Sequence, residues 1–167
     1  MSIPSRNGSV AGTYFVTSRT WESRKLFVVE TVREVFVNCR DENRVAGEFD
    51  LHSFGLMPDH FDVLLTRAQN KTLERRLQLA KGGSAHAVGK ARQVQFPVWQ
   101  RGFSDRCIRD AADRDNHVRY IEQNPVRKRL VTAAAEFRWS SAFNMIPMDI
   151  AAQGLKPQER AVAGRHG

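Results

Sequence analysis

The chain has 167 residues and a formal net charge of +8, from 26 basic and 18 acidic residues. Its length suits one domain with a substantial core, and a hydrophobic fraction of 41% is that of a soluble globular protein. The isoelectric point near 10.2 favours a polyanionic partner, most simply a nucleic acid. Composition alone does not choose among DNA, RNA and another anionic surface.

The sequence also lacks the signals of membrane and secreted proteins. No run of eighteen apolar residues is present, so no membrane span is expected. Residues 1–12 have no hydrophobic segment and are interpreted as a flexible start, not a signal peptide. Cys39 and Cys107 lack the spacing of a zinc or redox motif and are typical of reduced thiols. We therefore expect a bacterial-type cytoplasmic location, at the nucleoid.

The first half of the chain predicts three strands and a helix. Residues 13–19 alternate and are rich in β-formers, which favours a strand. Residues 23–39 carry Leu26, Val29 and Val32 at helical spacing. Residues 49–57 and 60–66 are a second and a third strand, joined by a tight turn at Pro58-Asp59.

A two-residue loop at that turn sets the register of the hairpin. It pairs Met57 with His60 and Gly55 with Asp62. Gly55 would then leave open space beside Asp62. His52 would fall on the opposite face of the sheet, which argues against it as a ligand of any site there.

The second half predicts two helices with a short strand between them. Residues 72–80, extending toward 91, form a basic helix that Gly82-Gly83 interrupts or ends. Residues 96–108 are irregular or strand-like. Residues 110–123 form a helix with acidic first turns, and Pro125 ends it and moves Asn124 out of ideal helical geometry. Residues 126–143 return along the body, and no periodicity follows residue 147.

The order strand, helix, strand, strand, helix, strand, helix predicts an α+β fold. It is the split βαβ pattern of a ferredoxin-like antiparallel sheet, with helices on one face and an additional C-terminal helix that carries Tyr120. The other face of the sheet would remain available for a ligand.

Two polar residues share one face of the third strand. Side chains alternate along a strand, so His60 and Asp62 point the same way while Phe61, Val63 and Leu65 point to the other face. An imidazole nitrogen and a carboxylate a few ångströms apart are a generic hint of a metal site.

The last predicted helix carries a second polar group. His117, Tyr120 and Asn124 are spaced by three and four residues, so they share a stripe next to Val118 and Ile121. A tyrosine beside an apolar stripe is usually a half-buried packing residue, and an asparagine before proline is equally often a helix end. Spacing alone therefore leaves a structural role open for both.

Taken together, the two segments resemble the single-tyrosine HUH transposases, most closely the REP-associated tyrosine transposases. That family has Met-Pro-Asn/Asp-His-x-His on a strand and Tyr-Ile-x-x-Asn-Pro-Val on a later helix. Here these are residues 57–62, MPDHFD, and residues 120–126, YIEQNPV. Residues 14–17, 81–83, 98–101 and 139–142 match in order, so the resemblance spans residues 13–143. One position departs from the pattern, because Asp62 replaces the second histidine.

The resemblance implies a DNA transposase-type strand transferase that cleaves and rejoins single-stranded DNA, usually at hairpin or palindromic repeats. Tyr120 would form a 5′-phosphotyrosine link, and His60, Asp62 and Asn124 would hold Mg²⁺ or Mn²⁺. His117 is a candidate base. Residues 13–146 would be the catalytic and DNA-binding domain and residues 147–167 a flexible tail, in a monomer or homodimer.

Asp62 leaves three hypotheses open. A carboxylate is a harder ligand than imidazole and suits Mg²⁺, but it adds negative charge next to the phosphate. The protein would therefore be an active strand transferase or a catalytically lapsed DNA-binding protein of the same fold. A metal-dependent nuclease that uses water is the third hypothesis, under which the spacing of Tyr120 and Asn124 has no purpose.

Basic residues in three segments are the candidate DNA contacts, because Lys and Arg neutralise phosphates. Trp99 and Phe103 are candidates either for stacking unpaired bases or for core packing. The candidate basic residues are Arg75, Arg76, Lys81, Lys90, Arg92, Arg101, Arg127, Lys128 and Arg129.

Overall fold

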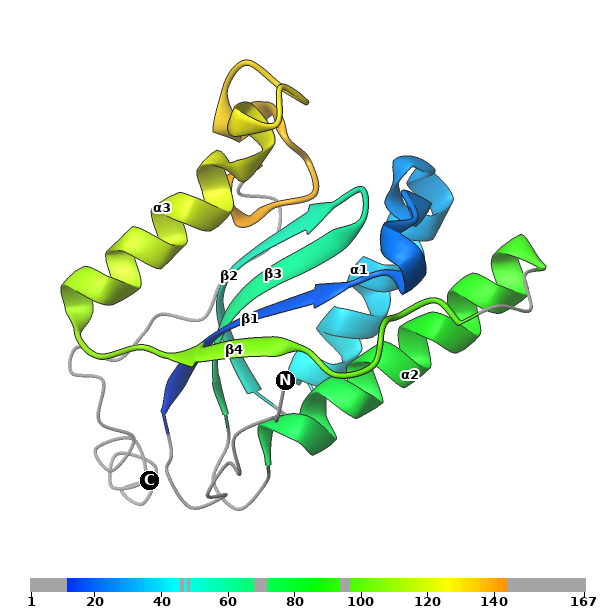
Figure 1. Cartoon of the computed structure of the whole chain (residues 1–167), viewed down its shortest axis with the longest axis horizontal. Coiled ribbons are helices and arrows are strands. Elements are labelled where there is room, and N and C mark those ends of the chain that lie inside the picture. Colours follow the sequence, from blue (N-terminus) through cyan, green and yellow to red (C-terminus); the bar gives the residue numbers. More distant parts are fainter. Residues whose placement is uncertain (1–11, 46, 48, 68–71, 94–96, 144–167) are drawn as a thin grey trace.

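The computed structural model describes residues 12–45, 47, 49–67, 72–93 and 97–143 (Figure 1). The predicted flexible start and tail lie almost wholly outside these ranges. Four 3₁₀ turns within the described residues, Trp21–Ser23, Leu26–Val28, Ala134–Glu136 and Ser141–Phe143, supplement the main elements. The main elements are β1 (Thr13–Arg19), α1 (Glu30–Val45), β2 (Phe49–Met57), β3 (His60–Arg67), α2 (Leu73–Arg92), β4 (Ser104–Cys107) and α3 (Ala111–Arg127).

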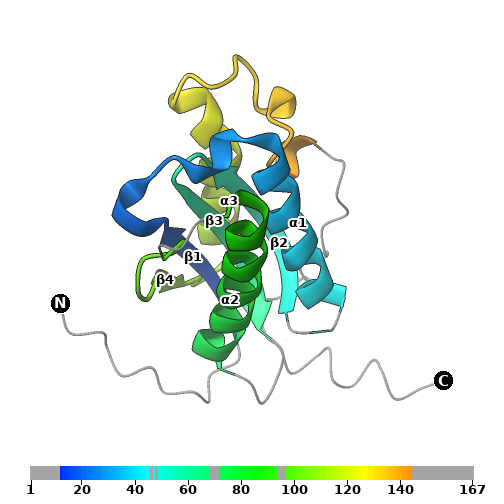
Figure 2. The ribbon, with the colours of Figure 1, turned by 90° about the vertical axis from the view of Figure 1, so that its right-hand side faces the viewer.

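The four strands form one antiparallel sheet in the order β2-β3-β1-β4. With α1 and α2 as the crossovers, this is the predicted ferredoxin-like split βαβ arrangement. Figures 1 and 2 show α1 and α2 on one face of the sheet and α3 on the other. No described helix is long and apolar enough to cross a membrane.

Alternation along β3 divides the apolar residues between the two faces. Phe61, Val63 and Leu65 are buried in the cluster that includes residues of α1 and α2, whereas Leu64 packs with Ile121 of α3. The larger core therefore lies between the sheet and the two crossover helices, and a smaller apolar cluster fixes α3.

Trp99 belongs to the larger core. Its ring lies 5.3 Å from that of Phe27 and 5.2 Å from that of Phe61, and its indole N–H donates to the Ser84 hydroxyl at 3.1 Å. Phe103 is partly buried against the same cluster. Of the two roles considered for Trp99, the structure shows core packing, since only 7% of the residue is exposed.

The helix predicted from residue 23 begins later. Residues 21–28 form two 3₁₀ turns, with Glu22 and Ser23 at φ of 53° and 52°, and α1 then runs from Glu30 to Val45. Two left-handed residues in sequence cannot continue a right-handed helix, and this stops helical propagation there.

The prediction that Gly82-Gly83 interrupts the second helix was wrong. α2 is continuous over twenty residues, with the Thr72 hydroxyl accepting from the Arg75 backbone N–H at its start. Each glycine costs a helix about 1 kcal/mol relative to alanine. Burial of Leu77 and Val88 against the core on either side of the pair offsets that cost.

The prediction that Pro125 ends the last helix was also wrong. α3 includes Pro125 and ends at Arg127, with Asn124 in helical geometry. Proline lacks an N–H, so it removes only the bond to the carbonyl of Ile121. The next bonds, from Lys128 N to the Asn124 carbonyl and from Leu130 N to the Pro125 carbonyl, are both 2.9 Å long.

The β2–β3 hairpin has the predicted register, with Met57 opposite His60 and Gly55 opposite Asp62. Two inferences from it were wrong. A bulge between Leu51 and Ser53 turns His52 toward the face of Asp62, where its Nε2 lies 2.7 Å from Thr66 Oγ1. The space beside Gly55 is not open, because α3 fills it with Ile121.

Candidate active site

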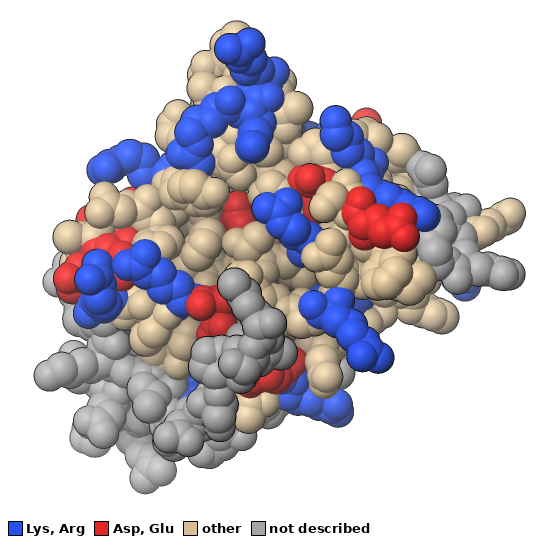
Figure 3. All heavy atoms as spheres, in the orientation of Figure 1, with Lys and Arg blue, Asp and Glu red and all other residues tan. Residues whose placement is uncertain are grey.

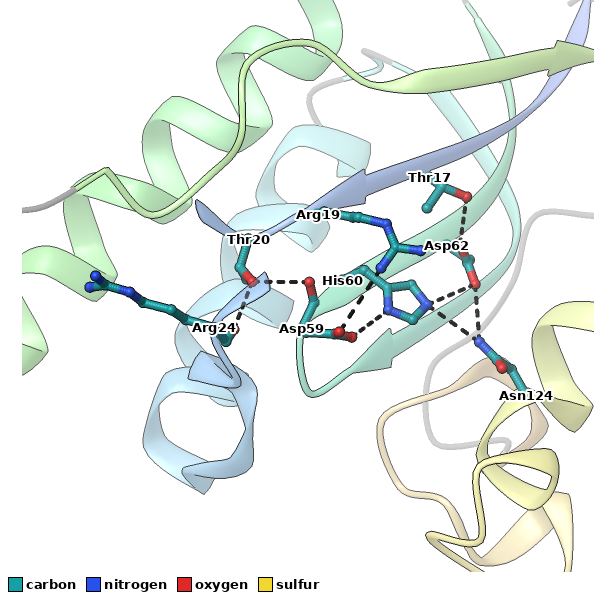
Figure 4. Close-up of polar contacts among 8 residues, drawn as sticks. All are labelled: Thr17, Arg19, Thr20, Arg24, Asp59, His60, Asp62 and Asn124. Atoms are coloured by element: carbon teal, nitrogen blue, oxygen red, sulfur yellow. Dashed lines mark hydrogen bonds and ion pairs between the residues drawn. The ribbon is translucent and has the colours of Figure 1, made fainter. Parts of the chain in front are cut away.

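Three predicted ligands meet between β3 and α3. His60, Asp62 and Asn124 are 8%, 2% and 3% exposed. His60 Nε2 lies 3.5 Å from Asp62 Oδ2, and the Asn124 amide nitrogen lies 3.4 Å from that Nε2 and 3.3 Å from that Oδ2. Figure 4 shows the three side chains pointing toward one another. Period-two alternation on β3 and the close approach of α3 at Gly55 produce this convergence.

Two further side chains hold His60 and Asp62 in place. The Asp59 carboxylate lies 2.7 Å from His60 Nδ1, and Thr17 donates to Asp62 Oδ1 at 2.7 Å (Figure 4). Arg19 Nη1 lies 4.0 Å from the other Asp59 oxygen. In the neutral tautomer with the proton on Nδ1, the lone pair of Nε2 is directed toward Oδ2 of Asp62.

The electrostatics of His60 are set by burial and by its two carboxylate neighbours. Burial disfavours the charged ring and by itself would lower the pKa of His60. The hydrogen bonds and negative charges of Asp62, and to a smaller extent those of Asp59, outweigh burial, so the pKa is raised.

The donor set fits a hard divalent cation. A carboxylate on the second ring nitrogen of a ligand histidine is the usual outer partner of a metal site, and Asp59 occupies that place. The described residues contain no group of three His, Cys, Asp or Glu side chains able to hold a metal. The third ligand would therefore be the Asn124 amide, with its oxygen turned toward His60 and Asp62.

Tyr120 lies on α3, one turn before Asn124. The residue is 47% exposed, and its ring contacts the Phe15 ring edge-on at a centroid distance of 5.9 Å. Phe15 and Thr17 lie two residues apart on β1 and so share a face of the sheet. Tyr120 is thus over the same face as Asp62.

His117 lies one turn before Tyr120 and packs on the same Phe15 ring, at 4.9 Å. Its Nδ1 donates to the Asp113 carbonyl at 2.7 Å, so Nε2 carries the lone pair when the ring is neutral. The predicted candidate base therefore has an acceptor nitrogen and a fixed ring.

The sequence analysis missed Asp113, Thr17 and the role of Asp59. Asp113 is buried beside His117. The pKa of its carboxyl is lowered, chiefly by the hydrogen bond from the Arg109 backbone N–H. Burial acts in the opposite direction, and nearby cations lower the pKa further. The Asp110-x-x-Asp113 spacing is the one available signal, since Asp110 caps α3 by accepting from the Asp113 N–H. Thr17 reaches Asp62 only through strand register.

The predicted DNA-contacting residues fall into three groups. Arg75, Lys90 and Arg101 are exposed, as are Arg127, Lys128 and Arg129 at the end of α3. Figure 3 shows Lys and Arg side chains gathered over that end of the molecule. The side chains of Arg76 and Arg92 lie outside the described part of the chain.

Lys81 has an internal role. Its ammonium donates to the carbonyls of Gln100 and Gly102 at 2.8 and 2.7 Å, which fastens α2 to the segment before β4. Burial lowers the pKa of Lys81 to about 8. A phosphate contact by Lys81 would have to replace these two hydrogen bonds.

Two known proteins similar to this chain match it over about nine tenths of its length. No family model matches it. A curated protein of Haemophilus influenzae named "Putative REP-associated tyrosine transposase" is 26% identical over 161 residues, which cover 90% of each chain. A solved structure titled as a REP-associated tyrosine transposase bound to a REP hairpin is 23% identical and has a TM-score of 0.72, covering 92% of this chain and 93% of that one. The structural match shows a shared fold.

Proposed function

We propose that the chain is a transposase-type strand transferase acting on single-stranded DNA. It is a homologue of a REP-associated tyrosine transposase over nine tenths of its length, in agreement with the prediction from its motifs. The observation that carries the proposal is the meeting of His60, Asp62 and Asn124 one helical turn from Tyr120. An amide, a carboxylate and an imidazole buried together next to an exposed tyrosine suit phosphodiester chemistry.

The proposed substrate is DNA that carries a hairpin or palindromic repeat. The structurally similar transposase is bound to a REP hairpin, and the net charge of +8 suits a polyanion. Such a substrate would place the protein at the nucleoid of a bacterial-type cell.

In the proposed reaction Tyr120 is the nucleophile. Its hydroxyl oxygen attacks the scissile phosphorus, the bond from phosphorus to the 3′ oxygen breaks, and a 5′-phosphotyrosine forms. The departing 3′ oxygen takes a proton from solvent, which leaves a free 3′-OH on the other fragment. The proton of Tyr120 passes to Nε2 of His117, whose ring Asp113 and Phe15 hold in place. Attack by a 3′-OH on the phosphotyrosine reverses these steps, so resealing a strand needs no ATP.

His60, Asp62 and Asn124 would hold Mg²⁺ or Mn²⁺, which supplies Lewis-acid polarisation of a non-bridging phosphate oxygen when bound. Asp59 fixes the ring of His60, and Thr17 fixes the carboxylate of Asp62, so that Nε2 and Oδ2 face the same point. Preorganised donors lose little freedom on binding a cation.

One observation favours a second candidate function, a DNA-binding protein without strand cleavage. Asp62 already accepts hydrogen bonds from Thr17 and Asn124, so the group is satisfied internally without a cation. Its negative charge also opposes that of a phosphate.

A hairpin oligonucleotide labelled at either end separates these candidates. We expect wild-type protein with Mg²⁺ or Mn²⁺ to form a covalent protein–DNA adduct on the 5′-phosphate side. The adduct should disappear with chelator and in Tyr120→Phe. It should persist in Tyr14→Phe, which is the matched control because Tyr14 is the other of the two tyrosines in the chain.

The other outcomes identify the alternatives. Salt-sensitive binding without an adduct, unchanged by chelator or by Tyr120→Phe, supports the second function, and an adduct that appears in Asp62→His would identify the aspartate as the cause. Products with free 5′-phosphates that Tyr120→Phe leaves unchanged indicate a nuclease that uses water.

A further inference from the structure

Arg127 makes two contacts with the proposed nucleophile. Its guanidinium carbon lies 4.3 Å from the centroid of the Tyr120 ring, and its Nη2 donates to the Tyr120 backbone carbonyl at 2.9 Å. Arg127 is two helical turns after Tyr120, so its side chain extends back along α3 to reach both positions.

These contacts hold the Tyr120 ring on one side. The Phe15 ring meets it edge-on from β1, while the guanidinium covers a face of the ring. The hydrogen bond to the carbonyl anchors the guanidinium, so its position over the ring does not depend on the cation–π attraction alone. An exposed tyrosine thereby has a defined orientation before any DNA is bound.

The charge of Arg127 also suits the proposed reaction. The phenol oxygen gains negative charge as it loses its proton, and a fixed cation over the ring stabilises that charge more than it stabilises the neutral phenol. A guanidinium carries five N–H donors, and only one is used by the Tyr120 carbonyl.

We propose that Arg127 is the positioning residue of Tyr120, acting on the rate of strand cleavage through the nucleophile more than on DNA affinity. The inference rests on the proposed function. It separates Arg127 from Lys128 and Arg129, its exposed neighbours, which are candidate phosphate contacts. Arg138, an exposed arginine paired with Glu30 at 2.8 Å, is the control.

The test compares Arg127→Ala, Arg127→Lys and Arg138→Ala in the full chain on a hairpin oligonucleotide with Mn²⁺. Single-turnover adduct formation at saturating DNA is expected to fall about tenfold in Arg127→Ala and to be unchanged in Arg138→Ala. The Kd of each alanine variant should stay within about twofold of the wild-type value. Arg127→Lys should recover part of the rate, since an ammonium keeps the charge and loses the planar stacking.

A second readout needs no catalysis. In protein labelled with ¹³C at the tyrosine ring, Tyr120→Phe assigns one of two tyrosine signals. That signal should move in Arg127→Ala and stay in place in Arg138→Ala, with Tyr14 as the internal reference.

Three results would overturn the inference. One is full adduct rate in Arg127→Ala at saturating DNA with a weakened Kd, which is the signature of a phosphate contact. Another is a Tyr120 signal that Arg127→Ala leaves in place. The third, absence of any wild-type adduct, refutes the proposed function and this inference with it, whereas the first two refute the inference alone.

Discussion

Asp62 is fixed by a residue from another strand. Thr17 lies directly opposite it in the β1–β3 register and donates to Oδ1, and this directs Oδ2 toward His60 and Asn124. A buried carboxylate that lost this donor would lose part of the hydrogen bonding that offsets its burial. Thr17 therefore contributes both to stability and to the geometry of the site.

Thr17→Val removes the hydroxyl and nearly preserves the shape of the side chain. We expect it to lower the free energy of unfolding by about 1–3 kcal/mol, because a buried oxygen loses its partner. We also expect Mn²⁺ affinity to weaken about 10- to 100-fold, as for other outer partners of metal ligands. Urea unfolding and calorimetric titration with Mn²⁺ measure the two effects.

Thr13→Val is the control for this substitution. Thr13 lies on the same face of β1 and bonds Thr66 at 2.7 Å, away from His60. It should change stability without changing Mn²⁺ affinity. Equal affinities for Thr17→Val and wild type would contradict the proposed role of Thr17.

The contact between Thr17 and Asp62 illustrates what the sequence does not carry at this scale. Alternation within one strand placed His60 beside Asp62, because that spacing is local. The partner of Asp62 depends on how β1 pairs with a strand more than forty residues away, and no local pattern encodes that register.

At the scale of elements, the site depends on how closely α3 approaches β2. Gly55 permits this approach, because a Cβ there would lie 3.3 Å from Ile121 Cγ2 and 3.5 Å from the Ile121 carbonyl oxygen. That carbonyl is the one left without a helical N–H by Pro125. Ile121 precedes Asn124 by one turn, so displacement of the helix here moves Asn124 as well.

Gly55→Ala should destabilise the fold by about 1–3 kcal/mol through overpacking at Ile121. Gly83→Ala is the matched control, since nothing lies within 4 Å of a Cβ there, and it should stabilise α2 by about 0.5–1 kcal/mol. Chemical denaturation measures both changes. A neutral Gly55→Ala would show that α3 can shift without cost.

Lys81 links α2 to the segment before β4, and its pKa gives this link a pH dependence. The pKa is about 8 in the folded protein, below the ordinary 10.5, because burial disfavours the charged form. Between these values the unfolded chain binds more protons than the folded one, so raising the pH favours folding.

Relative to Lys81→Met, the wild type should therefore gain stability as the pH rises from 8 toward 10.5. Urea unfolding of both proteins at pH 7.5 and 9.5 checks the sign. If the stability of the wild type relative to Lys81→Met falls with rising pH, the hydrogen bonds to the carbonyls of Gln100 and Gly102 hold Lys81 in its charged form instead.

The elements that the sequence predicted well are those with a strong local period. The strands at residues 13–19 and 49–57 and the hairpin register match the structure because alternation and turn chemistry are local. The glycine pair in α2 and Pro125 in α3 misled the prediction, because burial of neighbouring residues outweighs their local cost.

At the scale of the whole molecule, positively charged side chains gather where α3 ends. Arg127, Lys128 and Arg129 are exposed there. Figure 3 shows Lys and Arg side chains gathered over this part of the molecule. Counterion release makes each phosphate contact visible in the salt dependence of DNA binding. The composition predicted a polyanionic partner, and the fold shows that these three consecutive basic residues are exposed at the end of α3.

Lys128→Ala should therefore weaken binding to hairpin DNA and reduce the slope of log Kd against log salt concentration by about one. Arg138→Ala is the control, since Arg138 is already paired with Glu30 at 2.8 Å. Fluorescence anisotropy from 50 to 300 mM salt is the measurement, with about 0.9 of a unit expected per contact. An unchanged slope would exclude Lys128 as a phosphate contact.

The two faces of the sheet separate the larger core from the proposed site. The larger core lies on the side of α1 and α2, and His60, Asp62 and Asn124 lie on the side of α3. A substitution at position 62 therefore disturbs only the smaller side, where Thr17 and Asn124 hydrogen-bond to Asp62. Under the proposed function, the residue at this position could change the chemistry of the site while the fold and its exposed basic residues remain.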